Sequence, residues 1–471
     1  MASLAIDYDA LFYIEGSDIY RDWDNNFTAE HMRDLELFIA DRISDRGPSK
    51  FVTNELAVGS YNRVLRFSFE SCGNDVALKF PKPGHTAASL AQEKITNEAT
   101  WMQFLKENTA LPIPHVYDYS TDVDSGPLKL PYILMDWVSG DNLRDFLAGK
   151  PPDDLRSGIY RQMAFYYIEL YRLRFERIGS ITKDETTGKW AVTKRPLTQD
   201  MHQFAIGIHD FPTKAWPTGP LQSNKSYFDF VNSQHTVQLW HLRNINASDA
   251  EQDGDGELTA AERLKKSSET ARRRYVARHG IRQLTDHFCA TDDDAETFRA
   301  FNPDLDPRNL LVDPETGDIT GLIDFEFTNS MPSQFARDPP LWLLVILPEN
   351  CLDKGFFPWF LQQYRPVLDQ FLDAMRVVEQ QLGYLPGETR LSTHMLDSWK
   401  TDRVWFNYAM THTEHVDSIY WDVLHKHHPA GVIPELPDLL QMDMEKYVEH
   451  TKNQLDKYEN AWTKYIALQR A

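Results

Sequence analysis

Residues 301–326 read "FNPDLDPRNLLVDPETGDITGLIDFE", and this stretch says more about the architecture than any other part of the chain. The run "NLLV" is strand-like, "DPETGD" is rich in turn-forming residues, and "ITGLIDF" is a second strand-like run, so the pattern predicts a tight hairpin. Asp304 and Asn309 would lie in the loop before the hairpin, and Asp324 at its far end. Carboxylate and carbonyl oxygens suit Mg²⁺, which also binds substrate phosphates. The stretch therefore predicts a magnesium site, and the question is whether the rest of the chain binds a phosphate donor.

Composition limits the classes of protein that are compatible with the chain. Its 471 residues exceed the size of one compact core, so two or more lobes are expected. A hydrophobic content of 42%, with 12% aromatic residues, argues against global disorder. The net charge of −21 argues against nucleic acid or an anionic membrane as a partner. A nucleotide remains compatible, because a local lysine and a metal ion can overcome the global field.

The cysteines and the N-terminal residues bear on the compartment. Cys72, Cys289 and Cys351 are widely separated and show no CxxC spacing, so neither a disulfide framework nor a zinc site is expected. The first twenty residues carry acids and lack the basic-then-apolar pattern of a signal peptide. No apolar run approaches the roughly 20 residues that span a bilayer. We therefore expect a soluble, cytoplasmic protein without a membrane partner.

The coarse pattern before residue 150 changes from helix to strand and back. Residues 18–46 have a helical pattern, "RVLRFSF" and "DVALKF" predict two strands joined by a turn, and "AQEKITNEATWMQFLKEN" predicts a helix. A buried strand in "PYILMDWV" then completes a small α+β lobe that ends near residue 138. Beyond residue 150 the chain is mainly helical, with clear helical patterns over 357–382, 394–424 and 437–468.

Lys79 and Glu98 form a candidate pair within this small lobe. Lys79 ends an apolar strand, and Glu98 lies beside the apolar helix face that carries Ile95 and Met102, whereas Glu93 lies on a polar face. A contact between Lys79 and Glu98 would position the lysine to bind the α- and β-phosphates of a nucleotide. The alternative is two unrelated surface charges, since a lysine in a strand usually extends its ammonium group into solvent.

Lys79, Glu98, "PDLDPRN" and "IDFEF", in this order, resemble the aminoglycoside phosphotransferase family, whose members are relatives of the eukaryotic protein kinases. The resemblance spans roughly residues 50–345. It implies a protein-kinase-like bilobal α+β fold, with an antiparallel sheet and one helix in a small N-lobe and a large, mainly helical C-lobe. We expect a helical extension over 1–50, a nucleotide-binding N-lobe over 51–138, and a C-lobe over 139–471. The C-lobe would hold the catalytic loop at 301–326 and an insertion around 180–280.

The resemblance also implies roles for individual residues. Asp304 would accept or orient the proton of a substrate hydroxyl, while Asn309 and Asp324 would hold Mg²⁺ against the phosphates of ATP or GTP. The remaining implied residues contact the nucleotide: the backbone from Asp136 to Val138 binds the purine, Met135 flanks it, and Gly59, Ser60 and Tyr61 cover the phosphates.

Three positions depart from the family pattern. Asn302 stands where the family usually has a histidine that braces the catalytic loop, the "AVGSYNRV" loop has one glycine, and "DFE" replaces the DFG of protein kinases. None of these changes removes a charged group that the mechanism needs, so activity is expected. Asp338 is expected either to brace the catalytic loop or to cap a helix N-terminus.

A second candidate metal site lies at "EQDGDGELTAAE", residues 251–262. Its spacing matches a calcium-binding loop, with Gly256 at the sharp turn. The ligands of this tentative Ca²⁺ site would be Glu251, Asp253, Asp255, the carbonyl oxygen of Glu257, and Glu262. The alternative is a solvated acidic loop in which Thr259 and Glu262 form a helix capping box.

The function expected from these patterns is ATP- or GTP-dependent phosphorylation of a hydroxyl group on a small molecule. Two alternatives belong to other classes. The chain could be a nucleotide-binding pseudokinase that acts as a scaffold, or a calcium-responsive binding protein on a kinase-like fold. Nucleotide turnover tests the first alternative, and a calcium titration tests the second.

Overall fold

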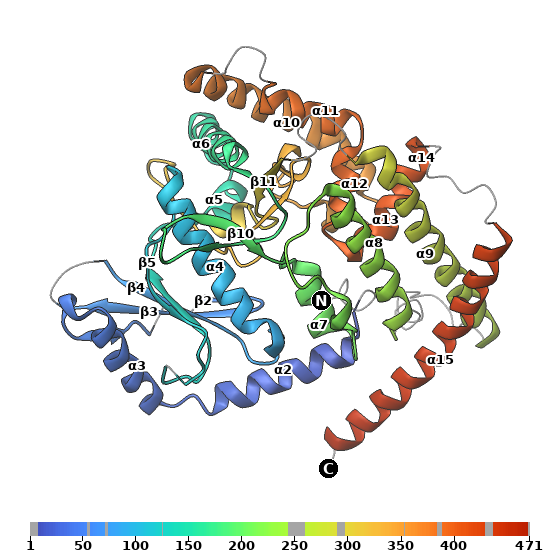
Figure 1. Ribbon diagram of the computed structural model, residues 1–471, viewed down its shortest axis with the longest axis horizontal. Helices are drawn as coiled ribbons and strands as arrows, with labels where there is room; N and C mark the ends of the chain where they lie inside the picture. Colours follow the sequence, from blue (N-terminus) through green and yellow to red (C-terminus); the bar gives the residue numbers. More distant parts are fainter. Residues whose placement is uncertain are drawn as a thin grey trace.

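The computed structural model describes residues 8–53, 57–70, 74–124, 126–243, 260–289, 297–352, 354–383, 389–428 and 437–469, and the structural statements below concern these residues. Figure 1 shows a small lobe built around a sheet and a larger lobe made mostly of helices. The predicted fold class, an α+β bilobal arrangement, is confirmed.

The small lobe contains an antiparallel sheet in the order β1-β3-β4-β6-β5, with β2 paired to β3. Its strands are β1 (Ser49–Phe51), β2 (Ala57–Val58), β3 (Asn62–Phe69), β4 (Val76–Pro81), β5 (Val116–Ser120) and β6 (Tyr132–Asp136). Successive side chains of a strand point to opposite faces. In β4 this alternation places Leu78 in one hydrophobic cluster and Ala77 in another, so Lys79 shares the face of Ala77.

A helix covers each face of this sheet. The helix α4 (Ala88–Asn108) packs Ile95 and Ala99 in the same cluster as Ala77. On the other face, α3 (Ala29–Arg42) contributes Leu35 and Ile39 to the cluster that contains Leu78. The expected sheet with one helix is therefore present, and a second helix from the N-terminal region covers its other face.

The N-terminal helical pattern is longer and more divided than the sequence predicts. The structure has α2 (Ala10–Asn25) followed by α3, where a single helix over 18–46 was expected. The break occurs at Thr28, which is the N-cap residue of α3. His31 accepts a hydrogen bond from the Thr28 backbone N–H and contacts its hydroxyl, and such local bonds favour a new helix start over continuation.

The predicted hairpin is confirmed. The strands β12 (Leu310–Val312) and β13 (Ile319–Leu322) pair antiparallel, and β7 (Asp141–Asn142) adds to the other side of β12. Gly317 adopts a φ of +74° in the turn, a conformation that costs glycine little. Asp304 and Asn309 lie in the loop before β12, and Asp324 follows β13, as expected.

The large lobe adds two smaller sheets and most of the helices. Its further strands are β8 (Arg174–Phe175), β9 (Ser180–Lys183), β10 (Trp190–Lys194), β11 (Phe298–Phe301) and β14 (Asn329–Pro332), of which β14, β11 and β8 pair in that order and β9 pairs with β10. Its α-helices are α5 (Leu143–Ala148), α6 (Asp153–Arg172), α7 (Gln199–Gly207), α8 (Asn224–His241), α9 (Ala260–Phe288), α10 (Phe357–Leu382), α11 (Leu391–Lys400), α12 (Arg403–Ala409), α13 (Val416–Ile419), α14 (His425–His427) and α15 (Asp438–Gln469). Within the described residues, no helix is both long enough and apolar enough to cross a membrane.

The helical pattern over 394–424 is also interrupted in the structure. It divides into α11, α12, a short 3₁₀ turn, α13 and a π-helical turn over Tyr420–Leu424. Asp402 has a φ of +59°, which ends the run of α11 before α12 begins. Apolar periodicity predicted the buried positions but did not signal this left-handed residue.

Candidate active site

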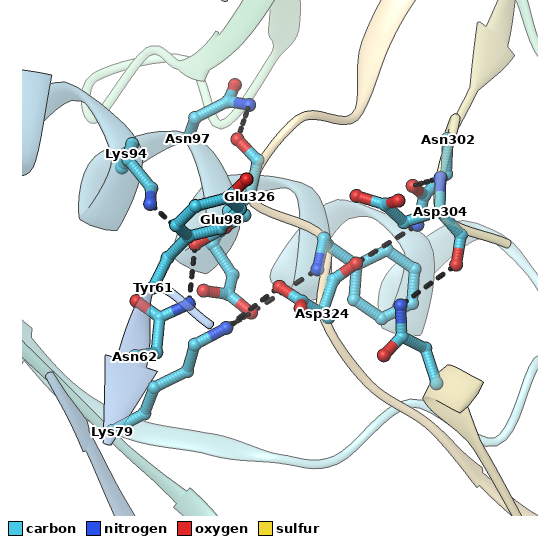
Figure 2. Close-up of polar contacts among 12 residues, drawn as sticks. Tyr61, Asn62, Lys79, Lys94, Asn97, Glu98, Asn302, Asp304, Asp324 and Glu326 are labelled. Atoms are coloured by element: carbon cyan, nitrogen blue, oxygen red, sulfur yellow. Dashed lines mark hydrogen bonds and ion pairs between the residues drawn. The ribbon is translucent and has the colours of Figure 1, made fainter. Parts of the chain in front are cut away.

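Lys79 lies at the centre of a group of charged side chains between the two lobes (Figure 2). Its ammonium group is 2.8 Å from Oε1 of Glu98 and 3.0 Å from Oδ1 of Asp324. The predicted contact between Lys79 and Glu98 is therefore present, and both side chains are buried. Glu93 instead binds Arg195, at 2.6 Å, on another side of α4.

The charges of this group depend on one another. Burial disfavours the charged form of Lys79, but the carboxylates of Asp324 and Glu98 outweigh that effect, so the pKa of Lys79 is raised. Burial raises the pKa of Glu98, and the Lys79 ammonium offsets part of this increase. The pair thus holds a cation where a nucleotide phosphate could bind it.

The loop before the hairpin is tied together by two asparagines. Asn302 accepts a hydrogen bond from the backbone N–H of Asp304, at 2.9 Å, and donates one to the carbonyl oxygen of Asp324, at 3.1 Å. Asn309 donates its side-chain N–H to the carbonyl oxygen of Asp304, at 3.0 Å. The structure thus brings Asp304, Asn309 and Asp324 together, and Asn302 braces the loop in the way expected of a histidine substitute.

Asp304 borders a cavity of about 420 Å³ in the large lobe. Burial raises the pKa of its carboxyl group to about 8, and the negative charges of Asp324 and Asp306 add to this effect. Such a group titrates close to neutral pH, the range in which a general base is most effective.

Asp324 has an unusual backbone conformation, with a φ of +69°. Non-glycine residues adopt this left-handed conformation infrequently, although aspartate does so more readily than most. Backbone strain of this kind is concentrated at functional sites, where surrounding contacts maintain it. Here Asn302 and Lys79 provide those contacts through the main-chain oxygen and the carboxylate.

The segment expected to bind a purine begins at Asp136, the last residue of β6. The backbone N–H of Asp136 donates to His115, and that of Trp137 donates to Asp75, both at 2.9 Å. The Asp136 carboxylate accepts hydrogen bonds from the His115 backbone and from the Tyr117 hydroxyl. These two N–H groups are engaged in the sheet, and the expected binding of a purine by the backbone from Asp136 to Val138 stays a prediction. Met135 is buried in the core.

The loop expected to cover phosphates is a tight turn. The Gly59 backbone N–H donates to the carbonyl oxygen of Asn62, at 3.0 Å, and Lys82 donates to the carbonyl oxygen of Gly59, at 3.2 Å. Gly59 and Ser60 are exposed at this turn. The Tyr61 side chain instead borders the cavity beside Asp304, with its ring centroid 4.7 Å from that of His202.

A second buried ion pair was not anticipated from the sequence. Lys94 of α4 lies 3.2 Å from Oε2 of Glu326, and Asn62 donates to the same oxygen at 2.8 Å. Asn97 donates to the carbonyl oxygens of Glu326 and Thr328, at 3.0 and 2.9 Å. Two sequence features could have indicated this pair: the glutamate in "DFE", and the four-residue spacing that places Lys94 on the same side of the helix as Glu98.

These contacts join the small lobe to the segment after the hairpin. Burial lowers the pKa of Lys94, and the negative charge of Glu326 opposes that effect. Burial, together with the charge of Lys94, also lowers the pKa of the neighbouring His202 well below its ordinary value, so this histidine is neutral at physiological pH.

The donor set around Asp324 suits a hard cation. Carboxylate oxygens of Glu98, Asp324 and Glu326 lie within 4.8 Å of one another, and Asn309 adds an amide oxygen to the same loop region. The second carboxylate oxygen of Glu98 is buried and has no hydrogen-bond partner among the described residues. Oxygen donors with negative charge are those that Mg²⁺ prefers, so the residues present fit the expected ion.

The tentative calcium loop falls mostly outside the described residues. Glu251, Asp253, Asp255 and Glu257 lie in the undescribed stretch, and Glu262 is known only as a backbone position near the start of α9. The calcium expectation has no support from the structure.

Asp338 takes neither of its two expected roles. It follows a short 3₁₀ helix and accepts hydrogen bonds from Ser398 of α11 and Asn407 of α12, the latter at 2.8 Å. Asp338 also borders the cavity. The tertiary packing of α11 and α12 supplies partners that lie 60 or more residues away in sequence.

Comparison with known proteins places more than half of the chain in one group, since residues 53–332 match the sequence model of the phosphotransferase enzyme family. The chain is 24% identical over 310 residues to "Altered inheritance of mitochondria protein 9, mitochondrial" of Meyerozyma guilliermondii. The aligned region covers 60% of this chain and 48% of the relative. The protein of the same name from Debaryomyces hansenii is 21% identical over 303 residues, covering 58% of this chain and 46% of the relative. The chain spans about half the length of these curated relatives.

Among solved structures, the Plasmodium vivax ethanolamine kinase is similar with a TM-score of 0.41 and 11% identity, over 87% of this chain and 82% of that one. This similarity is too low to assign a substrate. The expected cytoplasmic location is wrong by comparison with the fungal relatives, which are named as mitochondrial proteins. Composition misled here because the absence of a secretory pattern does not distinguish between intracellular compartments.

Proposed function

Because the chain belongs to the phosphotransferase enzyme family, we propose that it transfers the terminal phosphoryl group of ATP or GTP to a hydroxyl group of a small molecule. One observation carries the proposal: Lys79 lies between Glu98 and Asp324, beside a loop whose Asp304 borders a cavity. Phosphoryl transfer requires little covalent chemistry from the protein, so that positioning and charge compensation account for most of the rate.

Each residue of this group has a role that follows from its contacts. Lys79 would bind the phosphates of the nucleotide. Asn309 and Asp324 would hold Mg²⁺, which, when bound, would offset the negative charge of the phosphates. Asp304 would accept or orient the proton of the acceptor hydroxyl, and Asn302 would keep it in place through the backbone bond at 2.9 Å.

The cavity beside Asp304 is lined by more acidic than basic side chains, which favours a hydroxylated cation as the acceptor. Its acidic residues are Asp304, Asp306, Asp338, Glu349 and Glu414. Arg308 is paired with Asp306 at 2.5 Å, and burial lowers the pKa values of His412 and His415, so that neither histidine adds a positive charge at neutral pH. Aromatic rings in the wall can also attract a cation; they belong to Tyr61, Tyr167, Trp342 and Tyr408.

The test is consumption of ATP and GTP in the presence of Mg²⁺ with matched pairs of acceptors. Glucosamine against glucose, and ethanolamine against glycerol, compare an ammonium group with a hydroxyl group on similar frames. We expect turnover to be faster with the ammonium member of a pair and to fall at least about 100-fold in Asp304→Asn, because the base is lost. Asp210→Asn is the matched control, since Asp210 is exposed at the end of α7.

Other outcomes of this experiment identify the alternatives. Stabilisation of the protein by Mg²⁺-nucleotide without turnover of any acceptor would favour the pseudokinase scaffold. If the protein shows no stabilisation by Mg²⁺-nucleotide and no turnover, the proposed function is contradicted. Equal turnover of both members of each pair would contradict the cationic acceptor alone.

A mitochondrial location is proposed from the names of the fungal relatives. Cell fractionation of the full-length protein, with matrix and cytosolic markers, tests it directly. Recovery in the cytosolic fraction would contradict this part of the proposal.

A further inference from the structure

The N-terminal helix α2 (Ala10–Asn25) lies below the sheet of the small lobe in the view of Figure 1, and one of its ends lies beside α7 of the large lobe. At the small lobe it packs closely against the turn after β4. A Cβ atom on Gly16 would collide with the carbonyl oxygen of Gly84, so the two backbones touch. The rings of Tyr13 and Tyr20 contact His85, with centroids 5.5 and 5.7 Å apart. This end of α2 is therefore anchored by close packing.

At the large lobe, the residues before α2 are anchored by polar contacts. The backbone N–H of Asp9 donates to the carbonyl oxygen of Gly207, at 2.6 Å. The Asp9 carboxylate is fully buried and accepts a hydrogen bond from Arg243, also at 2.6 Å. A Cβ atom on Gly207 would lie 2.7 Å from the Tyr8 ring, so the ring can pack here only because Gly207 has no side chain.

Tyr8 reaches the cavity that also contains Asp304. Its single O–H can be donated to Oε1 of Gln203 or to Oε2 of Glu414, which lies 3.3 Å away. Gln203 in turn donates to the hydroxyl of Tyr61, at 3.4 Å. Tyr8, Gln203, Tyr61 and Glu414 all line the cavity. One tyrosine of the N-terminal segment thus links an acidic side chain of the acceptor cavity to the loop at Gly59–Tyr61.

From these contacts we propose that Tyr8 is a positioning residue for the acceptor, and that the segment from Tyr8 through α2 is a strap whose first residue, Tyr8, completes the cavity wall. The Tyr8 hydroxyl orients the carboxylate of Glu414 toward a hydroxylated ammonium ion, and its ring closes the cavity beside Tyr61. This inference rests on the proposed function, because it assigns the cavity to the acceptor. It predicts that the N-terminal segment affects acceptor binding and leaves nucleotide binding unchanged.

The test compares Tyr8→Phe with Tyr13→Phe, which removes a hydroxyl from the same N-terminal segment, at a ring that contacts His85 and does not line the cavity. Because Tyr8→Phe removes the donor shared by Gln203 and Glu414, we expect it to weaken binding of glucosamine or ethanolamine by at least about 10-fold. Binding is measured on the protein saturated with Mg²⁺ and ADP. Tyr8→Phe should bind ADP with the affinity of the wild type. Tyr13→Phe should bind both ADP and the ammonium probes as the wild type does.

Hydrogen–deuterium exchange of the same samples separates positioning from folding. We expect faster exchange in Tyr8→Phe over 199–207 and 412–416, with little change in melting temperature. Equal probe affinity in Tyr8→Phe and the wild type would overturn the positioning role, even if exchange changed. Unchanged exchange would overturn the strap.

The remaining outcomes separate the inference from the function on which it rests. If the wild type binds ADP but neither ammonium probe, the acceptor role of Tyr8 is overturned while the phosphotransferase proposal stands. If the wild type does not bind ADP with Mg²⁺, the proposed function itself fails.

Discussion

The ammonium group of Lys94 lies 3.2 Å from a carboxylate oxygen of Glu326, and both side chains are buried where the two lobes meet. Lys94 belongs to the helix that carries Glu98, and Glu326 follows Asp324 by two residues. Both buried pairs involve α4: Lys94–Glu326 joins it to the segment after β13, and Lys79–Glu98 joins it to β4, from which Lys79 also contacts Asp324. A change in one pair is expected to alter the position of Asp324 relative to α4.

Glu326→Gln should destabilise the folded protein strongly. It leaves the buried Lys94 ammonium without a charged partner, and removal of one member of a buried pair typically costs about 3–5 kcal/mol. The measurement is urea unfolding followed by circular dichroism. Combining Glu326→Gln with Lys94→Met should recover much of the loss, because the unpaired charge is then absent. Glu315→Gln, at an exposed position of the hairpin turn, is the control, and a loss for Glu326→Gln no larger than that of the control would contradict the prediction.

Lys79→Met should weaken binding of Mg²⁺-ADP by more than about 10-fold, since Lys79 is the cation that would contact the phosphates. Glu98→Gln should have a smaller effect in the same direction, because Lys79 keeps its contact with Asp324 at 3.0 Å. Isothermal titration calorimetry provides both affinities. Glu93→Gln, on the same helix but paired with Arg195, should bind as the wild type does. Wild-type affinity in Lys79→Met would remove the nucleotide site from this position.

Asn302→Ala should reduce kcat more than it reduces stability. The side chain makes two hydrogen bonds, to the backbone of Asp304 and of Asp324, and a misplacement of about 1 Å near the reacting groups can cost roughly 100-fold in rate. The loss of stability should be near 1 kcal/mol for each bond. Asn302→His, which restores the residue usual in the family, should keep more activity than Asn302→Ala. Equal rates in wild type and Asn302→Ala, measured as ATP consumption, would show that the loop does not need this brace.

The stability of the wild type should depend on pH through Asp338. Burial raises the pKa of this carboxyl group to about 6, from about 3.8 in an unfolded chain. The folded state therefore binds more protons between these two values, so the stabilising contribution is complete below about pH 4 and is lost as the pH rises through 6. Asp338→Asn cannot titrate, and its melting temperature should rise relative to that of the wild type between pH 4 and pH 7. If the melting temperatures of the wild type and Asp338→Asn change with pH in the same way across this range, the assignment is contradicted. Asp210→Asn is the control for the loss of an aspartate elsewhere.

Much of the candidate site could be predicted because its signals are local. The apolar alternation of β4 and the helical spacing around Glu98 predicted the contact of Lys79 with Glu98 rather than with Glu93. Turn-forming residues predicted the hairpin and the positions of Asp304, Asn309 and Asp324 around it. These features depend on backbone preferences and on side-chain periodicity, which a short stretch of residues already expresses.

Other features depend on segments that are distant in sequence. The backbone from Asp136 to Val138 is expected to bind a base, and only the folded chain shows that the N–H groups of Asp136 and Trp137 donate to His115 and Asp75. The pattern over 394–424 predicted one helix, and Asp402 divides it. Neither outcome is visible in a hydrophobic pattern, because it depends on which partner lies nearby in the folded chain.

The order and spacing of Lys79, Glu98, Asp304, Asn309 and Asp324 thus follow from the sequence, since each position belongs to a strand, helix or turn with its own local signal. The acidic cavity and its wall follow only from the folded structure. Tyr8 and Glu414 are 406 residues apart, yet they lie 3.3 Å from each other. Contacts at such separation arise when helices and sheets pack to bury apolar surface, and that packing is a property of the whole chain.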